Sequence, residues 1–410
     1  MMTKAILIIG AGYLQIPQVK IARELGLRVL VTDRNPFAPA IGMADEYFQI
    51  DTRDWEKHAR LGKELRARGD LAAVFCAAIS AEYSCAVAAQ SAKLPGIDPE
   101  LAHRISNKAA MRQALASLMP IRASSYNSFE AAQKGTSGLS AFVVKAQDSS
   151  GSRGLTKIYQ QSEFTETVFN RAKTFSLDGS VLIEEMFIAT RENGIPEQSV
   201  ETLWSNGHCY ALNQVDRPFI DNDNYAIEIG HINPASHSNK TLEENYALIE
   251  KCGTALGFKD GILKGDIILT ENGPVLLELT ARLSGGFDST HTSPLAHGTN
   301  YIRGAMRMAL GESIPWEDFL PKWYRHSVAQ SVFPSPGRIV SIDGIEEAKQ
   351  VPGIEYVFTR SKVGDVIPPY TSCVDRPLFV VTSGDTRQEA LNAAGLAIEK
   401  IKIVTESIDQ

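Results

Sequence analysis

The alternation of apolar strands and helices in the first hundred residues restricts the fold most. Lys4–Ile9 is an apolar run that ends at Gly10, and a helical pattern follows from Pro17 to Leu25. Three further strand patterns follow at Arg28–Thr32, Asp45–Ile50 and Leu71–Cys76. A helix is expected at Glu82–Ala92. Strands and helices in alternation predict a parallel, doubly wound sheet.

After Asn107 the pattern favours antiparallel hairpins. A helix expected at Lys108–Leu118 is stopped by Pro120. Strands are predicted at Ala141–Lys145, Thr156–Tyr159, Val181–Glu185, Gln198–Leu203, Cys209–Val215, Ile262–Thr270 and Pro274–Thr280. Helices are predicted at Thr241–Leu256 and Asn300–Leu310. This part of the chain is therefore not a continuation of the parallel sheet.

The tail has the pattern of a small α+β lobe. Its predicted elements are the strands Val328–Pro334, Gly337–Ile342, Tyr356–Phe358 and Leu378–Thr382 and the helix Thr386–Ile401. We expect a multidomain chain of mixed α/β and α+β class. Its predicted units are an α/β domain at 1–106, a central domain at 107–312 with a mobile part at about 120–186, and the lobe at 313–410.

Composition excludes several classes of protein. The 410 residues are 44% hydrophobic and 22% charged, which is ordinary globular usage, and the net charge of −7 gives no general attraction to nucleic acid or anionic membrane. No stretch approaches about 18 apolar residues, and the N-terminal apolar run is too short for a signal segment. The five cysteines are widely spaced without a CxxC pair, so we expect buried thiols in a reducing compartment. A cytoplasmic enzyme without nucleic-acid or membrane partners is predicted.

The first glycine turn is a weak nucleotide signal. Gly10 and Gly12 follow the first strand and Asp33 lies about twenty residues on, as in dinucleotide-binding folds. The position of the third glycine in that fingerprint is Gln15. NAD binding is therefore kept only as an alternative.

A second motif combines a lysine with a loop of small residues. Lys145 ends a strand, and the loop that follows is Ser149, Ser150, Gly151, Ser152, Arg153 and Gly154. Small residues let backbone N–H groups approach phosphate oxygens, and the two cations add positive charge. The motif is not a Walker A loop, and a plain hairpin turn also favours Ser and Gly.

The strongest motif is a pair of acids on one predicted hairpin. Asp266 and Glu278 fall on adjacent strands with apolar neighbours, where two unpartnered carboxylates would repel. A divalent cation removes that penalty, and oxygen ligands favour Mg²⁺ with phosphates completing the shell. Arg282, two residues beyond Thr280, is expected to hold an anion beside the metal. An ion pair of Arg with carboxylate in a structural hairpin is the alternative.

In this order the motifs resemble the ATP-grasp superfamily of carboxylate–amine ligases over nearly the whole chain. The branch with biotin carboxylase, the purine-pathway carboxylase subunits and the L-amino acid ligases looks most similar. The resemblance implies an ATP-grasp fold with an N-terminal doubly wound domain, a mobile phosphate-covering loop and a small C-terminal lobe. It also implies ATP and Mg²⁺ as cofactors, with Mn²⁺ as a substitute, and a homodimer.

The resemblance assigns roles residue by residue. Lys108 and Lys145 match the phosphate-binding lysines, and Ser149–Gly154 matches the loop. The residues expected around adenine and ribose are Glu184, Glu185, Phe187, Glu197 and Ile268. The expected metal ligands are Asp266, Glu278 and Thr280. The residues expected to act on the reacting groups are Lys145, Arg153 and Arg282.

Two features depart from the family pattern. Thr280 stands where an Asn normally helps to hold magnesium, and the segment Ala189–Pro196 lengthens the link before Glu197. The implied reaction converts a carboxylate to an acyl phosphate with ADP release and joins it to an amine, with an amino acid expected. The alternatives are a bicarbonate-using carboxylase, an NAD-dependent oxidoreductase and a non-catalytic ATP-binding protein. Substrate residues are expected between Arg217 and His231 and between Ser284 and His291. Asp216, Arg217, Tyr225 and His231 are suited to bind either an amino group or a carboxylate.

Overall fold

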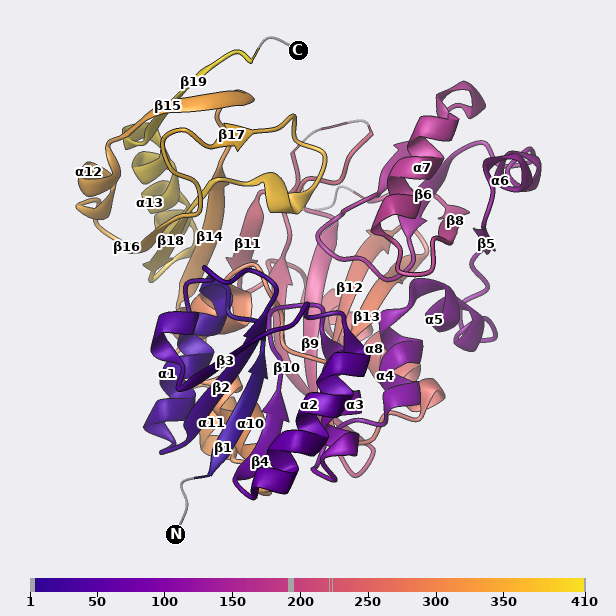
Figure 1. The fold of residues 1–410 in the computed structure, drawn as a ribbon. Helices are drawn as coiled ribbons and strands as arrows, with labels where there is room; N and C mark the ends of the chain where they lie inside the picture. The colour runs from indigo at the N-terminus through magenta and orange to yellow at the C-terminus, as the bar shows by residue number, and fades with distance from the viewer. Residues whose placement is uncertain (1–3, 191–194, 221, 223, 409–410) are drawn as a thin grey trace.

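The described residues form four β-sheets with helices packed around them. The structure is a computed structural model that describes residues 4–190, 195–220, 222 and 224–408. Figure 1 shows the N-terminal sheet below, the small sheet of β5–β8 at the upper right and the end of the chain at the upper left, with a long sheet between them.

The N-terminal sheet is parallel and doubly wound, as predicted. Its strands lie in the order β3-β2-β1-β4 and are β1 (Ala5–Ile9), β2 (Arg28–Asp33), β3 (Glu46–Gln49) and β4 (Leu71–Phe75). Its helices are α1 (Ile16–Glu24), α2 (Trp55–Arg68) and α3 (Glu82–Ser91). One face buries Ile6 and Ile8 against α1, and the other buries Leu7 and Ile9 against α2 and α3.

A helix from much later in the chain also covers one face of this sheet. Helix α10 (Tyr301–Ala309) packs with α1 on the same face, where Tyr301, Ile302 and Met306 join the core of Ile6 and Ile8. The division at residues 107 and 313 stays a prediction. The contact shows that the central part of the chain contributes to the core of the first sheet.

A four-stranded antiparallel sheet follows, in the order β5-β8-β6-β7. Its strands are β5 (Ala123–Tyr126), β6 (Phe142–Ala146), β7 (Thr156–Ile158) and β8 (Val181–Glu185). The neighbouring helices are α4 (Pro99–Ser106), α5 (Lys108–Ala114), α6 (Phe129–Gly135) and α7 (Glu166–Phe175). The predicted helix at Lys108–Leu118 is thus shorter than expected. Helices α6 and α7 cover one face with an aromatic core that includes Phe142 and Phe169.

The long sheet has eight antiparallel strands in the order β13-β12-β9-β10-β11-β14-β18-β16. They are β9 (Glu197–Ser205), β10 (His208–Asp216), β11 (Gly230–Asn233), β12 (Gly261–Thr270), β13 (Gly273–Thr280), β14 (His326–Val332), β16 (Ile354–Thr359) and β18 (Leu378–Gly384). Both predicted hairpins, β9–β10 and β12–β13, are confirmed. The sheet continues across residue 313 because β11 pairs with β14.

The tail adds a second, smaller sheet. Strands β15 (Gly337–Asp343), β17 (Val366–Ile367) and β19 (Lys402–Glu406) form it, and α12 (Ile345–Lys349) and α13 (Arg387–Lys400) lie nearby. Helix α13 packs its alanine face on β14 and β18. The remaining helices and turns are α8 (Asn239–Leu256), α9 (Ser293–His297), α11 (Trp316–Phe319), Tyr13–Gln15, Ile41–Met43, Gln161–Glu163, Asp288–Thr292 and Cys373–Asp375.

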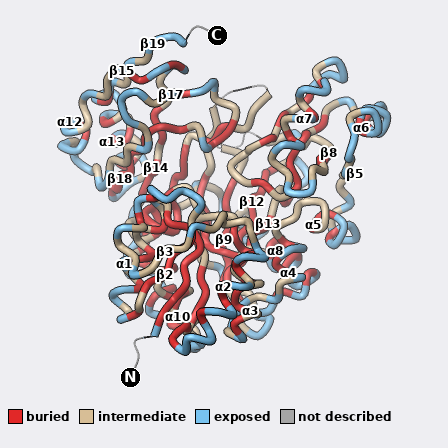
Figure 2. The backbone as a smooth tube through the Cα atoms, in the orientation of Figure 1, coloured by how far each residue is buried: buried red, intermediate tan, exposed pale blue. Residues whose placement is uncertain are grey.

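Buried residues run through the strands of the parallel sheet and the long sheet (Figure 2). Among the described residues, no helix is long and apolar enough to cross a membrane. All five cysteines are free thiols. Cys252 and Cys373 are buried as predicted, but Cys76, Cys85 and Cys209 are only partly buried.

Candidate active site

The two predicted acids lie directly opposite each other. Strands β12 and β13 pair so that Asp266 faces Glu278, and the next pair on the same face is Lys264 with Thr280. Residues directly opposite in an antiparallel ladder share one face of the sheet, and every second residue along a strand shares that face. The predicted hairpin therefore brings both acids and Thr280 to one surface.

Cations already compensate both carboxylates. Lys108 Nζ lies 2.9 Å from Glu278 Oε2, Arg217 Nη1 lies 3.0 Å from Asp266 Oδ2, and Lys264 pairs with Asp266 Oδ1. Burial opposes the ionisation of Glu278, but Lys108 and Lys264 hold its pKa well below the ordinary value. Glu278 is thus stable as an anion, which is the form that binds a metal.

The phosphate loop reaches the same point through Lys108. The Nζ of Lys108 donates to Ser149 O at 2.7 Å while it contacts Glu278. In the loop, Gly151, Ser152 and Gly154 have positive φ, and Arg153 Nε donates to Ser150 O at 3.0 Å. Lys108, the loop and Glu278 were predicted separately, and the structure joins them in one chain of contacts.

Lys145 and Glu184 form a buried ionic cluster with Arg112. Lys145 Nζ pairs with Glu184 Oε1, and Arg112 Nε lies 2.9 Å from Glu184 Oε2. Burial raises the pKa of Glu184, but Lys145 and Arg112 outweigh it and lower the pKa to about 2. Glu185 points to the opposite face of β8, where it pairs with Arg122 at 3.2 Å. The roles of Glu184 and Glu185 toward adenine stay predictions.

The structure also places the other residues that were predicted to belong to the site. Ile268 is buried in β12 opposite Glu197, and Phe187 is half-buried just after β8. Arg282 Nε lies 2.7 Å from Glu82 Oε1, so its guanidinium pairs with the first turn of α3. Its expected place beside the metal stays a prediction. In the lengthened link Ala189–Pro196, positions 191–194 fall outside the described residues.

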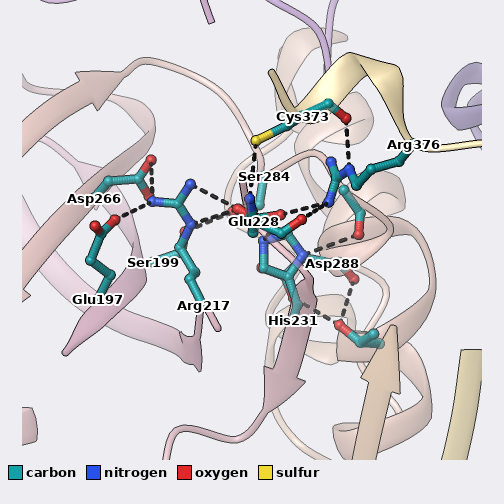
Figure 3. Close-up of polar contacts among 12 residues, drawn as sticks. Glu197, Ser199, Arg217, Glu228, His231, Asp266, Ser284, Asp288, Cys373 and Arg376 are labelled. Atoms are coloured by element: carbon teal, nitrogen blue, oxygen red, sulfur yellow. Dashed lines mark hydrogen bonds and ion pairs between the residues drawn. The ribbon is translucent and has the colours of Figure 1, made fainter. Parts of the chain in front are cut away.

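A second polar cluster surrounds Arg217 (Figure 3). Its guanidinium contacts Glu228 at 2.8 Å, Glu197 at 3.5 Å and Asp266 at 3.0 Å. Glu228 also contacts Arg376 at 3.2 Å and His231 at 3.5 Å. Burial opposes the ionisation of Glu228, but His231, Arg217 and Arg376 hold its pKa well below the ordinary value. The cluster thus carries acidic and basic groups side by side.

Burial has the opposite result at Glu197. Desolvation raises its pKa to about 7, and Arg217 only partly offsets the effect.

Asp216 lies on the other face of β10, where it pairs with Arg387 at 2.6 Å and with His237 at 3.3 Å. Tyr225 packs under Arg171, whose guanidinium carbon is 4.7 Å from the ring centre. Asp216 and Tyr225 therefore have partners other than Arg217.

Several residues of the site were not singled out as site residues from the sequence. Lys264 lies two residues before Asp266 and Arg112 lies four after Lys108, so strand and helix periodicity could have indicated both. Glu228 precedes the predicted His231 by three residues. Arg376 carries no local signal for the site, because it is more than a hundred residues from Glu228, the site residue that it contacts.

The donor set fits one Mg²⁺. Asp266 and Glu278 offer carboxylate oxygens, and the buried Oγ1 of Thr280 has no hydrogen-bond partner among the described residues. No group of three His, Cys, Asp or Glu side chains suited to a metal occurs within the described parts of the chain. A magnesium ion here would use these few oxygens and take the rest from phosphate or water.

Two domain families match the sequence. The ATP-grasp domain matches residues 139–291, and L-amino acid ligase C-terminal domain 2 matches residues 330–406. A protein of Sinorhizobium fredii named uncharacterized protein y4rH is 26% identical over 399 residues, which cover 93% of this chain and 79% of that protein.

Solved structures agree in fold over almost the whole chain. L-amino acid ligase from Bacillus licheniformis has a TM-score of 0.81 at 20% identity, and the match covers 99% of this chain and 100% of the ligase chain. Phosphoribosylglycinamide synthetase from Anaerococcus prevotii has a TM-score of 0.74 at 19% identity, with 99% and 100% covered. The biotin carboxylase domain of Hydrogenobacter thermophilus 2-oxoglutarate carboxylase, solved with MgADP and bicarbonate, has a TM-score of 0.71 at 18% identity, with 98% and 91% covered.

The fold, the paired acids and the domain matches define the class. The chain carries an ATP-grasp domain and has the ATP-grasp fold, as the sequence motifs indicated. It combines the ATP-grasp domain with the C-terminal domain of L-amino acid ligases in one chain. Proteins of this superfamily bind ATP and Mg²⁺ and act on small molecules.

Proposed function

We propose that this chain joins a carboxylate to the amino group of an amino acid at the expense of ATP. The observation that carries the proposal is the contact chain from Ser149 O through Lys108 Nζ to Glu278 Oε2. It links the phosphate loop, a phosphate-binding lysine and a metal-binding acid in one place. Such an arrangement suits transfer of a phosphoryl group between two oxygens.

The chemistry proceeds in two balanced steps. A carboxylate oxygen of the first substrate attacks the γ-phosphorus, the bond to the bridging oxygen breaks, and ADP leaves. The amine of the second substrate then attacks the acyl carbon, the carbon–oxygen bond to phosphate breaks, and the amine loses its proton. The products are an amide, ADP and inorganic phosphate. Mg²⁺, when bound, supplies positive charge for the transferring phosphoryl group.

The residues of the chain have distinct tasks in this proposal. Lys108 and Lys145 neutralise phosphate oxygens, and the backbone of Ser149–Gly154 closes over them and excludes water from the acyl phosphate. Asp266, Glu278 and Thr280 hold the metal. Arg153 and Arg282 stabilise the reacting phosphoryl and carboxylate groups. In the structure Lys108 pairs with Glu278 and Lys145 pairs with Glu184, so phosphate would replace a carboxylate as the partner of each lysine.

The adenine and ribose sites are proposed between the end of β8 and the strands β9 and β12. Glu184, Glu185 and Phe187 lie at the end of β8, and Ile268 pairs in register with Glu197 on β9. Glu184, Phe187 and Ile268 would surround adenine together with the backbone of Glu185, whose side chain points to the other face of β8. Glu197 would bind the ribose hydroxyls in exchange for its contact with Arg217.

An amino acid suits the cluster around Arg217. A substrate of this class carries a carboxylate and an ammonium group, and the cluster offers both guanidinium and carboxylate groups within contact distance of one another. Arg217 and Arg376 would bind the carboxylate, and Glu228 the ammonium group. The match to an L-amino acid ligase domain at residues 330–406, which includes Arg376, supports this choice over a bicarbonate-using carboxylase.

The first glycine turn argues against the NAD alternative. Gln15 folds back over this turn, where Gly12 N donates to its Oε1 at 3.0 Å and its Nε2 donates to Ala77 O. Ala11 N donates to Asp33 Oδ2 at 2.9 Å. The N–H groups of Ala11 and Gly12, which would face a pyrophosphate, are therefore satisfied within the chain.

The test is nucleotide analysis after incubation with ATP, Mg²⁺ and pooled amino acids and carboxylates. We expect ADP and phosphate that depend on the pool, and a new amide by mass spectrometry. Stimulation by bicarbonate alone would indicate a carboxylase, and AMP with pyrophosphate would indicate adenylation. Either result, or ATP bound with no turnover in any pool, would contradict the proposal. The expected homodimer is tested separately by light scattering.

A further inference from the structure

Lys264 lies on the same face of the sheet as the acid pair, two residues before Asp266 on β12. On β12 it is directly opposite Thr280 of β13 on one side and Glu201 of β9 on the other. Its side chain is buried, and its ammonium group pairs with Asp266 Oδ1 on the same strand. A buried lysine therefore stands in the middle of the surface that would hold the metal.

The two acids differ in how their charges are compensated. Asp266 has a cation on each oxygen, Lys264 on Oδ1 and Arg217 on Oδ2, whereas Glu278 is paired through one oxygen with Lys108. Lys108 also contacts the phosphate loop, so nucleotide can draw it away from Glu278. Lys264 is held by its neighbours within the sheet and has no such alternative contact among the described residues.

A second divalent cation would meet a poor site here. It would have to share the oxygens of Asp266 with Lys264 and Arg217, and the repulsion between like charges is strong in a buried site. Thr280 adds a single hydroxyl oxygen. One ion can still bind between Asp266 and Glu278, because a carboxylate oxygen accepts from more than one partner.

We propose that Lys264 supplies the second positive charge of this site, so that the chain binds nucleotide with one divalent cation. The inference rests on the proposed function, because it concerns the metal that accompanies ATP. Two-metal sites use their second ion to neutralise charge on the transferring group. Here an ammonium group fixed in the protein does the same without a second ion.

The experiment counts bound Mn²⁺. Mn²⁺ replaces Mg²⁺ at oxygen sites, and the signal of free Mn²⁺ in electron paramagnetic resonance gives the number bound. The protein is titrated in the presence of the non-hydrolysable ATP analogue with a β,γ-imido bridge. The variants are Lys264→Met, which removes the charge, and Lys264→Arg, which keeps it. The exposed Lys259→Met just before β12 is the control.

We expect one Mn²⁺ per bound analogue in the wild-type protein, in Lys264→Arg and in Lys259→Met, and two in Lys264→Met. Two in the wild-type protein would overturn the inference even if Lys264→Met does not fold. One in a folded Lys264→Met would also overturn it. Binding of the analogue is measured first by its effect on the melting temperature. Without binding, the proposed function fails and this inference with it, whereas a count of two with analogue bound contradicts only the role of Lys264.

Discussion

Lys108 Nζ lies 2.9 Å from Glu278 Oε2 and thereby ties the first residue of α5 to β13. The same ammonium group donates to Ser149 O in the phosphate loop. One lysine thus contacts both parts of the proposed phosphate site, the metal-binding acid and the phosphate loop. The contact also explains how this half-buried carboxylate stays ionised before a metal arrives, since burial alone would favour its neutral form.

Glu278→Gln is expected to abolish most ATP turnover and to leave the fold intact. The amide keeps the shape of the side chain but removes the charge that holds the metal, so kcat should fall by at least about 100-fold, as when a group that stabilises the transition state is lost. ADP release and the melting temperature are measured together. The control is Glu271→Gln on the exposed turn of the same hairpin. Normal turnover in a folded Glu278→Gln protein would contradict the assignment of this acid.

Lys145 and Arg112 share Glu184 but should respond differently to substitution. Arg112 also donates to Leu276 O at 2.8 Å and Leu277 O at 3.0 Å, so it ties the small antiparallel sheet to β13. Arg112→Met is expected to lower the free energy of unfolding by about 3–5 kcal/mol, the cost of breaking a buried ion pair from one side. Lys145→Met leaves Glu184 paired with Arg112 and should lose ATP turnover with a smaller loss of stability.

Urea denaturation of both variants checks this difference. The exposed Arg104→Met on α4 is the control for loss of an arginine charge. If Lys145→Met destabilises the protein as much as Arg112→Met, the lysine has a structural role in the cluster. If Lys145→Met keeps normal turnover, its role toward phosphate is wrong.

The parts of the fold that follow local rules could be predicted from the sequence. The strands of the parallel sheet are continuous apolar runs, and the hairpin of β12 and β13 is marked by the turn at Asn272 and Gly273. The turn alone would place Asp266 opposite Leu277, but the register shifts by one residue between Asp266 and Ile267, so that Asp266 faces Glu278. Helix α2 was missed, because its buried stripe of His58, Leu61 and Leu65 is interrupted by many charged residues.

The parts that depend on distant pairing could not be predicted. Strand β11 pairs with β14 almost a hundred residues later, and this pairing makes one sheet of two predicted units. Arg376 reaches Glu228 from the last part of the chain. The alternation of side chains along a strand predicts that Arg282 lies on the same face as Thr280, beside the metal. Its pairing with Glu82 depends instead on how α3 packs against the end of β13. No local spacing carries these contacts.

Glu201 should make stability depend on pH. Burial, followed by the nearby Asp288, raises its pKa from 4.5 to about 7. The folded state therefore keeps a proton that the unfolded state releases above 4.5. Because the unfolded state binds fewer protons in this window, the free energy of unfolding falls as pH rises from 4.5 to about 7.

Glu201→Gln removes this dependence. Gln stays neutral at every pH and keeps an oxygen for Ser284 N, which donates to Glu201 Oε1 at 2.7 Å. Urea denaturation is measured from about pH 5 to about pH 8. Over this range the free energy of unfolding of the variant should rise relative to that of the wild-type protein by up to about 3 kcal/mol. The exposed Glu243→Gln on α8 should run parallel to the wild-type protein. Parallel curves for Glu201→Gln as well would show that Glu201 is ionised at neutral pH.

Gly286→Ala is expected to damage the cluster around Arg217 through His231. Gly286 has a φ of +63°, and a Cβ built there would lie 2.4 Å from Cε1 of His231, whose Nδ1 bonds to Gly286 O at 3.0 Å. The ring would have to move away from Glu228, its other partner. Gly257→Ala is the matched control, because Gly257 has a similar φ of +76° with open space around it. The backbone cost of about 1–2 kcal/mol is common to both variants.

The comparison therefore isolates the contact with His231. We expect Gly286→Ala to be less stable than Gly257→Ala in urea denaturation, and to raise the KM for the amino acid substrate where Gly257→Ala does not. The KM is taken from ADP release at saturating ATP. Equal stability and equal KM in the two variants would show that His231 moves freely and takes no part in holding the substrate.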